Sequence, residues 1–367
     1  MSQYRIVAVS DVSLGFGSPQ IAAFLRSLQH FYGPAAEVIL FEPDEPQKPS
    51  RQSFFPTVDI RRVSTAFHPH TGIGRVEYLT QVAPVVNRLH PDVLVLFCTY
   101  TLPVLFHLHS RPPFVIFYAL ESAALYGKFD IQMNRSIGSL VDLIIYPEEN
   151  RAARDIAISG YRAIPFVTIY NCSDSHQSRT PLSPRDRNGR VLYQGTIDFE
   201  RTHGSYYLNP KLQDLPIDLF GPITGSDGSD LEARLGSLSG QVRYRGFIDA
   251  ATLSAFRPNY LFSIVIWNPI NENTLYACPN KFFESIADGV PPITAPHPQC
   301  DELVRRYGCG IVMADWTFES FLQAIEDGLR MRGSDLYEEM VSNCQRATMQ
   351  ELNWNAQFDR IKPFLRR

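Results

Sequence analysis

Short apolar runs alternate with segments of helical periodicity along this sequence, and that alternation constrains the fold more than any other feature. The first run is Arg5-Ile6-Val7-Ala8-Val9-Ser10, an unbroken apolar stretch typical of a strand buried on both faces of a parallel sheet. A helical pattern follows at 20–31, with Pro19 at the first position and Ser18 as N-cap. Further strands are expected at 37–41, 91–97, 114–118, 141–146 and 165–170, with a weaker one at 59–63. Strands and helices at this spacing predict a doubly wound α/β domain.

A polar segment at 173–189 interrupts the pattern and contains serines, prolines and charges with hardly any apolar residue. The same architecture then begins again, with strands expected at 190–195, 217–221, 242–246, 260–267 and 311–313. We therefore predict a Rossmann-like domain over 1–172, a linker over 173–189, a second Rossmann-like domain over 190–345 and a C-terminal segment over 346–367, with a last helix at about 355–365. A cleft between the domains, at the carboxyl ends of both sheets, is the expected ligand site.

Length and charge exclude several classes of protein. The 367 residues exceed one ordinary core, which agrees with two domains. A net charge of −4 provides no broad basic field, so we expect no nucleic-acid partner. No apolar run reaches the roughly 18 residues that span a bilayer, and the first residues lack a signal-peptide pattern. We expect a cytoplasmic protein whose membrane association is peripheral at most.

Cysteines and histidines do not form a metal motif. The six cysteines contain no Cys-x-x-Cys pair and are expected to be reduced thiols. His68 with His70, and His107 with His109, could hold a metal only if a third ligand came from elsewhere. The sequence therefore predicts neither a metal nor another cofactor.

The stretch 279–293 carries the clearest chemical signal. Asn280 is expected to cap a helix over 281–288, and Gly289 to end it in the left-handed conformation. A helix N-terminus suits a diphosphate, Lys281 in the first turn adds a full positive charge, and Glu284 could accept hydrogen bonds from both ribose hydroxyls. The alternative is an amphipathic helix whose Lys281 and Glu284 form a weak surface pair.

A glycine-bearing loop at 11–19 follows the first strand. Gly15 and Gly17 would let the backbone approach a ligand closely at the carboxyl end of that strand. A dinucleotide fingerprint is the competing interpretation, with Glu42 as the ribose carboxylate. The third glycine of that pattern is Gln20 here, so the nicotinamide alternative fits poorly.

Residues 190–313 resemble the donor-binding half of GT-B glycosyltransferases, particularly the large family-4-like group. The matching motifs are Val191-Leu192-Tyr193-Gln194-Gly195, Phe220-Gly221, Arg245-Gly246-Phe247-Ile248 and Pro279-Asn280-Lys281-Phe282-Phe283-Glu284 with Ala287-Asp288-Gly289-Val290-Pro291. The segment 142–152 resembles the last strand and helix of the acceptor half, and Asn353-Trp354 resembles the turn before the C-terminal helix. The resemblance implies the GT-B fold, in which two Rossmann-like domains face a cleft and the C-terminal helix crosses back to the first domain.

The resemblance also implies an activity. A sugar would pass from a nucleotide-diphosphate donor, such as a UDP-sugar, to a hydroxyl acceptor that is a glycan, a lipid-linked molecule or a small molecule, as in polysaccharide biosynthesis. Such an enzyme would work without a metal, at the inner membrane face where its acceptor is lipid-linked. The loop at Gly15 and Gly17 would face the leaving diphosphate or the acceptor.

The resemblance assigns the donor contacts residue by residue. Glu284 matches the glutamate that binds the ribose, and the backbone before that helix, at Asn280, would meet the diphosphate. A basic residue in the loop after Gly195 would contact phosphate. Arg201 is the first candidate, because its charge is permanent and its donors can be bidentate, and His203 is the second.

Two departures from the family pattern concern the chemistry. Many members carry two glutamates with seven residues between them, and the first would fall at Tyr276, which removes a usual sugar contact. A histidine often follows the strand that matches 114–117, where this chain has Tyr118-Ala119-Leu120-Glu121. Glu121 is therefore the candidate base for an inverting displacement, the alternative being a carboxylate that merely favours a helix N-terminus.

Two other functions fit the same architecture. A nucleotide-sugar epimerase would need no acceptor. A non-catalytic nucleotide-sugar-binding partner subunit would explain the missing glutamate at Tyr276.

Overall fold

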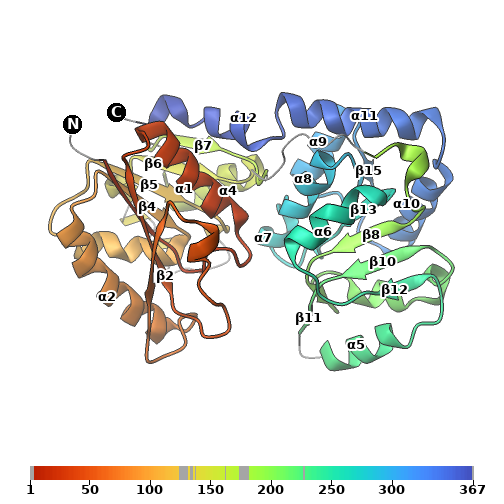
Figure 1. The fold of residues 1–367 in the computed structure, drawn as a ribbon, viewed down its shortest axis with the longest axis horizontal. Helices are drawn as coiled ribbons and strands as arrows, with labels where there is room; N and C mark the ends of the chain where they lie inside the picture. Colours follow the sequence, from red (N-terminus) through yellow and green to blue (C-terminus); the bar gives the residue numbers. More distant parts are fainter. Residues whose placement is uncertain are drawn as a thin grey trace. The chain divides into compact units, whose positions relative to one another are not determined.

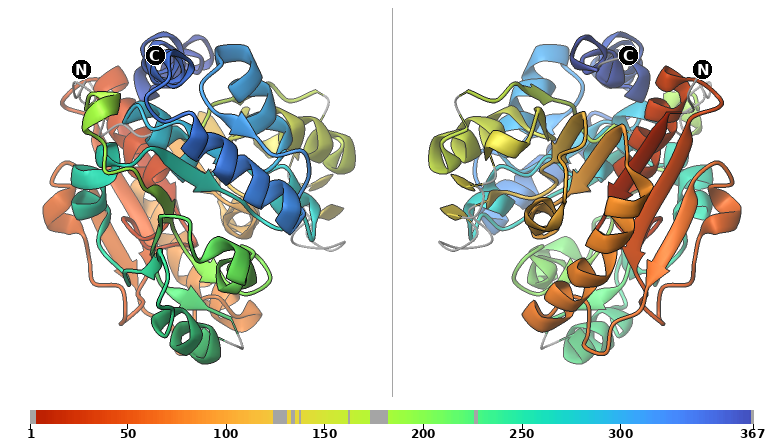
Figure 2. Two further views of the ribbon diagram at one scale, coloured as in Figure 1. Left: turned by 90° about the vertical axis from the view of Figure 1, so that its right-hand side faces the viewer. Right: turned by 90° about the vertical axis from the view of Figure 1, so that its left-hand side faces the viewer.

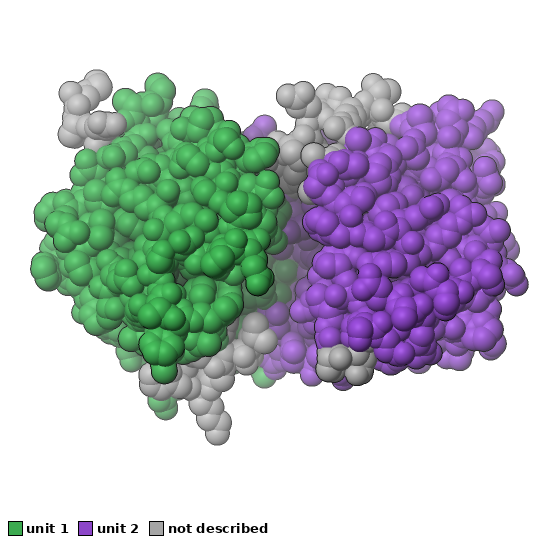
Figure 3. Space-filling model, turned by 60° about the horizontal axis from the view of Figure 1, so that its bottom comes forward, with its two compact units in different colours: residues 1–170, 357–367 green, residues 171–356 purple. Residues whose placement is uncertain are grey.

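The computed structural model describes residues 4–123, 131–132, 135–136, 138–161, 163–172, 182–225 and 228–365. The chain divides into two compact units, which Figure 3 colours separately. Unit 1 contains Met1–Tyr170 and Gln357–Arg367, and unit 2 contains Asn171–Ala356. Residues 173–181, half of the expected linker, lie outside the described residues.

Unit 1 is built on a seven-stranded parallel sheet with the order β3-β2-β1-β4-β5-β6-β7 (Figure 1). Its strands are β1 (Arg5–Val9), β2 (Glu37–Pro43), β3 (Asp59–Val63), β4 (Val93–Phe97), β5 (Phe114–Tyr118), β6 (Leu143–Tyr146) and β7 (Phe166–Thr168). The central strands are buried on both faces, which accounts for their continuous apolar sequence. The strand order reverses between β1 and β4, so a crevice is expected outside the carboxyl ends of these two strands.

The helices of unit 1 are α1 (Pro19–Tyr32), α2 (Gly72–Leu89) and α4 (Glu149–Ser159), among the described residues. Thr71 caps α2 by accepting a hydrogen bond from the Gly74 N–H. Ser18 occupies the predicted N-cap position of α1, but its side chain forms no capping hydrogen bond. The Pro19 ring fixes the entry into α1 and leaves one fewer N–H to cap.

The end of the chain packs in unit 1. Figures 1 and 2 mark the C-terminus on this unit. Gln357 accepts a hydrogen bond from the Tyr170 N–H through its side-chain oxygen, and the Phe358 ring meets the Phe24 ring of α1 edge-on at 6.2 Å. The last helix is shorter than expected. It comprises α12 (Trp354–Asp359) and a separate 3₁₀ turn at Lys362–Phe364, because Pro363 cannot continue an α-helix.

Unit 2 contains a six-stranded parallel sheet with the order β12-β10-β8-β13-β14-β15 and a small parallel pair, β11-β9. The strands are β8 (Val191–Gln194), β9 (Ile197–Asp198), β10 (Ile217–Phe220), β11 (Ile223–Thr224), β12 (Val242–Tyr244), β13 (Phe262–Val265), β14 (Pro292–Thr294) and β15 (Ile311–Val312). The helices are α5 (Gly228–Gly236), α6 (Ala250–Phe256), α7 (Glu272–Leu275), α8 (Asn280–Ala287), α9 (Pro298–Tyr307), α10 (Phe318–Arg330) and α11 (Asp335–Gln350). Here the strand order reverses between β8 and β13.

Both units therefore have the predicted Rossmann-like architecture of parallel strands and connecting helices. Within the described parts of the chain, no helix is both long enough and apolar enough to cross a membrane.

Candidate functional site

In unit 2, several of the predicted residues lie together where the strand order reverses between β8 and β13, which we call the switch point of this unit. β8 ends at Gln194 and is followed by Gly195, while Trp267 follows the neighbouring strand β13. A Cβ placed on Gly195 would lie only 3.7 Å from the Nζ atom of Lys281, so the first turn of α8 lies against the glycine turn. This is the position where open parallel sheets bind ligands.

Lys281 is buried, with 8% of its surface exposed. Its Nζ atom lies 4.2 Å from the centroid of the Tyr193 ring, and no hydrogen bond or ion pair joins it to any described residue. Burial is the main cause that lowers the pKa of this ammonium to about 7; the positive charge of Arg201 contributes to the decrease, and the charge of Glu284 opposes it. The surface-pair alternative is therefore wrong for Lys281: this lysine is buried inside the fold and forms no ion pair with Glu284 or any other described carboxylate.

Other polar nitrogens in the same region also lack protein partners. The Arg201 guanidinium lies over the Trp267 ring, 5.3 Å from its centroid, and the indole Nε1 is buried without a hydrogen bond. The Nε2 atom of His203 is likewise buried and unpaired, and burial lowers the pKa of that imidazole. A ligand with several acceptor oxygens would satisfy such a group of nitrogens.

His297 lies in the same unit but is already satisfied. Its Nε2 atom accepts a hydrogen bond from the Trp267 N–H at 3.3 Å, and its Nδ1 atom lies 3.1 Å from the Leu275 carbonyl oxygen. Burial lowers its pKa to about 4, so the ring is neutral at physiological pH. His297 therefore positions the backbone after β13, a role that no local sequence pattern indicated.

Glu284 is held by an ion-pair network. Its Oε2 atom accepts a hydrogen bond from Gln194 at 2.8 Å and lies 3.1 Å from the guanidinium of Arg257. Arg257 is buried, and it also donates to Gln194 and pairs with Asp288 at 2.8 Å. Only Oε1 of Glu284 is without a partner among the described residues, so the carboxylate is fixed by one oxygen and presents the other.

The helix that carries these side chains begins one residue earlier than predicted. Pro279 occupies the N-cap position in an extended conformation, and Asn280 is the first helical residue, so the predicted Asn280 cap is wrong. Pro279 can take this position because the N-cap conformation is compatible with its fixed φ. Gly289 follows the helix with a φ of 68°, as predicted. Phe282, Phe283 and Ile286 anchor the helix in the core.

The remaining predicted residues belong to unit 1. Gly15 and Gly17 have φ values of 82° and 100°, a conformation that favours glycine. Glu42 is buried and accepts a hydrogen bond from the Leu14 N–H at 2.6 Å, so it supports the glycine loop and is not free to bind a ribose. Glu121 follows β5, is half-buried, and forms no hydrogen bond or ion pair with the described residues.

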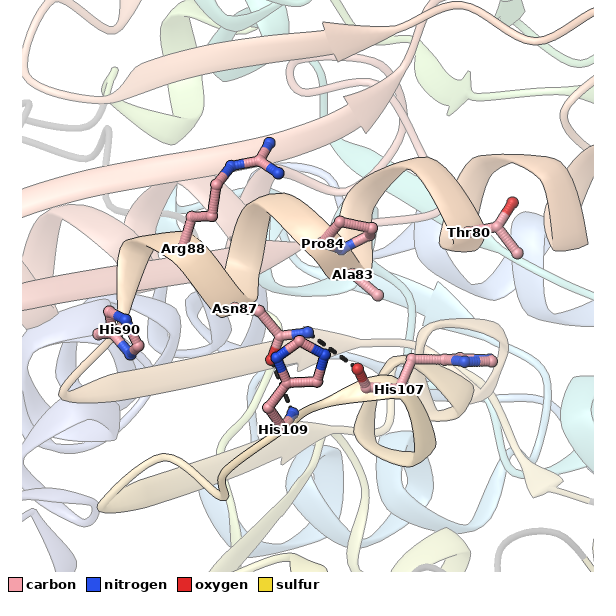
Figure 4. Close-up of a pocket in the computed structure, with 8 residues that line it drawn as sticks. All are labelled: Thr80, Ala83, Pro84, Asn87, Arg88, His90, His107 and His109. Carbon is pink, nitrogen blue, oxygen red and sulfur yellow. Dashed lines mark hydrogen bonds between the residues drawn. The ribbon is translucent and has the colours of Figure 1, made fainter.

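A cavity of about 450 Å³ lies elsewhere on unit 1, between α2 and the 3₁₀ segment Thr99–His107 (Figure 4). It is lined by His90, His107 and His109 among others. The side-chain amide of Asn87 donates a hydrogen bond to the His107 carbonyl oxygen and accepts one from the His109 N–H. In Figure 4 the His107 ring extends away from the His109 ring. No group of three or more His, Cys, Asp or Glu side chains in the described residues could hold a metal ion.

Comparison with solved structures identifies the fold. The structure is similar to Anabaena HepE in complex with UDP and glucose, with a TM-score of 0.75 and 13% sequence identity over 98% of this chain and 99% of that chain. It is also similar to sucrose-phosphate synthase from Thermosynechococcus elongatus (TM-score 0.72, 15% identity, 98% of each chain). A third similar structure is the lipopolysaccharide outer core galactosyltransferase WaaB (TM-score 0.66, 13% identity, 98% of each chain).

By sequence, neither a protein-family model nor a curated protein matches the chain. Each structural similarity nevertheless covers nearly the whole chain. The protein therefore has the GT-B fold of these glycosyltransferases.

Proposed function

We propose that this protein is a glycosyltransferase that moves a sugar from a nucleoside-diphosphate donor to a hydroxyl acceptor. The observation that carries the proposal is the buried, unpaired ammonium of Lys281 at the switch point of unit 2. A buried amine without a counter-ion is costly to keep charged, so a lysine at this position calls for an anion that arrives with a ligand. A diphosphate supplies that charge.

In this proposal the diphosphate and the ribose of the nucleotide-sugar donor each contact residues of this site. Lys281 and Arg201 stabilise the negative charge that develops on the departing diphosphate, together with the N–H groups at the start of α8. These cations supply the stabilisation for which other enzymes use a metal. Glu284, held through Oε2 by Arg257 and Gln194, accepts a ribose hydroxyl on Oε1.

UDP-glucose is the first donor to test, because HepE has been crystallised with UDP and with UDP-glucose. The acceptor is a hydroxyl of a glycan, a lipid-linked molecule or a small molecule. Its proton must pass to a base, for which the sequence nominates Glu121.

A thermal-shift panel of UDP, GDP, ADP, CMP and NAD tests donor binding. We expect at least one nucleoside diphosphate to raise the melting temperature, since a ligand that binds only the native state must do so. The shift should fall in Lys281→Ala and Glu284→Ala and persist in Arg305→Ala, a control on the exposed face of α9. Equal shifts in all four proteins would refute the nucleotide site.

Radiolabelled UDP-glucose then separates the three functions. Label in a new glycoside or in free glucose indicates transfer to an acceptor or to water. Label in an altered nucleotide sugar indicates an epimerase. If the nucleotide sugars that raise the melting temperature bind but yield neither a transferred sugar nor an altered nucleotide sugar, the protein is the non-catalytic subunit.

A further inference from the structure

Two cysteine side chains of unit 2 meet beside the helix that carries Lys281. The Sγ atom of Cys300 lies 3.4 Å from the Sγ atom of Cys278, and both residues are fully buried. All six cysteines are thiols in this structure. The sulfurs of a disulfide are about 2.05 Å apart, so this pair would form one after an approach of roughly 1.4 Å.

Each of the two cysteines lies at the start of a helix. Cys278 directly precedes Pro279, the N-cap residue of α8. Cys300 is the third residue of α9, where the helix N-terminus favours a negative charge. The two residues are 22 positions apart in the sequence, so their contact is made by the fold and not by a local motif.

The first turn of α9 also holds the chain segment that leads into α8. The Nδ1 atom of His297, the N-cap residue of α9, lies 3.1 Å from the Leu275 carbonyl oxygen. The Cys300 thiol lies 3.9 Å from the Ala277 carbonyl oxygen, in addition to its contact with Cys278. A change at Cys300 is therefore transmitted directly to the residues before α8.

The start of α8 is where such a change would matter. Only Pro279 and Asn280 separate Cys278 from Lys281 along the chain. Burial is the main cause that lowers the pKa of Lys281, and the charge of Cys300 is one of the causes that oppose this decrease. The sulfur pair is thus close to the Lys281 ammonium both along the chain and electrostatically.

We propose that Cys278 and Cys300 are a reversible modification site, at which a peroxide converts the two thiols into a disulfide. The new bond pulls the residues before α8 towards α9, displaces Lys281 and weakens nucleotide binding, a consequence that rests on the proposed function. Hydrogen peroxide is the co-reactant of choice, because both sulfurs are buried and the oxidant must be nearly as small as water.

The reaction needs no other oxidant. The Cys300 thiolate attacks one peroxide oxygen, the O–O bond breaks, and the departing hydroxide takes up the proton that the thiol released and leaves as water. The Cys278 sulfur then attacks the sulfenic acid on Cys300, the S–S bond forms as the S–O bond breaks, and a second water leaves with the Cys278 proton. Two thiols lose two electrons, and one peroxide is reduced to two waters. A dithiol reductant reverses the modification by exchange.

Peptide mapping of the full chain tests the disulfide. Trypsin cuts after Lys281 and Arg305, so Cys278 and Cys300 lie on different peptides, and Cys300 is the single cysteine of its own. After peroxide treatment and alkylation of the remaining thiols, we expect these two peptides to be joined, and to separate after dithiothreitol. The joined pair should be absent from Cys278→Ala and Cys300→Ala and present in Cys344→Ala, a buried cysteine outside the pair.

Calorimetric titration with UDP, GDP and ADP measures the consequence for binding. Peroxide should lower the affinity of the wild type for the nucleotide that binds by about tenfold, because a displacement of this size misaligns a charged contact. Dithiothreitol should restore the affinity, which needs no variant and so does not depend on how well a variant folds. Cys278→Ala should bind equally well before and after peroxide, which excludes damage at other residues.

The outcomes separate this inference from the proposed function. A wild type that yields no joined peptides, or that yields them with unchanged nucleotide affinity, overturns the inference and leaves the proposed function standing. Joined peptides in a protein that binds none of the three diphosphates, oxidised or reduced, would instead refute the proposed nucleotide site and leave only the disulfide in place.

Discussion

The Lys281 ammonium lies on the face of the Tyr193 ring, 4.2 Å from its centroid, and no carboxylate among the described residues pairs with it. A cation–π contact of this kind offsets only part of the cost of burying a full charge. The folded state therefore holds the Lys281 proton less tightly than the unfolded chain does. The next two predictions follow from this difference.

The stability of the wild type should rise with pH more steeply than that of Lys281→Met. The folded-state pKa is about 7, below the ordinary 10.5, so between these values the unfolded chain holds a proton that the folded protein has released. The stability contribution is thus lost as pH falls towards 7 and gained as pH rises, by up to about 1.4 kcal/mol per pH unit. Urea unfolding of both proteins at pH 6, 7, 8 and 9 measures the difference, and parallel curves would contradict the prediction.

Binding of UDP at pH 8 should draw a proton from solution. The diphosphate favours the charged form of Lys281, which is mostly neutral at that pH in the free protein. Calorimetric titration in buffers of different ionisation enthalpy should show uptake of up to one proton per site. Lys281→Arg is the matched control, since its side chain is already charged and should bind UDP without that uptake. Equal uptake in the two proteins would assign the proton to another group.

Loss of Arg257 should destabilise unit 2 strongly. Arg257→Met removes the guanidinium that pairs with the buried Asp288 carboxylate and with Glu284. Breaking a buried pair in this way costs about 3–5 kcal/mol. The exposed pair of Arg305 with Asp301 gives the comparison, and Arg305→Ala should cost less than about 1 kcal/mol. Denaturant midpoints measure both, and similar small losses would show that Asp288 finds another partner.

Gly221→Ala should disrupt the turns after β8 and β10. Gly221 has a φ of 141°, and a Cβ there would lie 1.9 Å from the Gly195 carbonyl oxygen. Since that oxygen belongs to backbone, relief requires the turn beside Lys281 to move, and we expect both a lower melting temperature and a weaker UDP shift. Gly236→Ala at the end of α5 meets no atom within 4 Å and should be neutral or stabilising. Normal UDP binding by Gly221→Ala would show that a change in the turn after β10 does not alter the turn after β8.

Local patterns predicted much of this structure. Most strands of the two large sheets follow from their apolar runs, and the helix at 280–287 follows from the spacing of Phe282, Phe283 and Ile286. The N-cap was misplaced by one residue because Pro279 and Asn280 both suit a helix start. The break in the last helix was missed because the apolar pattern continues past Pro363.

Contacts between distant segments could not be predicted in the same way. Arg257 lies 63 residues from Gln194 and 27 from Glu284, and nothing near it in the sequence marks it as their partner. The Asp11 carboxyl after β1 and the Cys98 thiol after β4 meet only because β1 and β4 are neighbours in the sheet. The burial of Lys281, which decides its chemistry, likewise depends on the glycine turn after β8.

Unit 1 is assembled from both ends of the chain. Gln357 and Phe358 complete the packing around Tyr170 and Phe24, with the whole of unit 2 encoded between them. During synthesis, the first 170 residues therefore emerge well before the segment that covers them. The apolar surface around Phe24 therefore stays exposed to water or to a chaperone until the ribosome has also made the whole of unit 2.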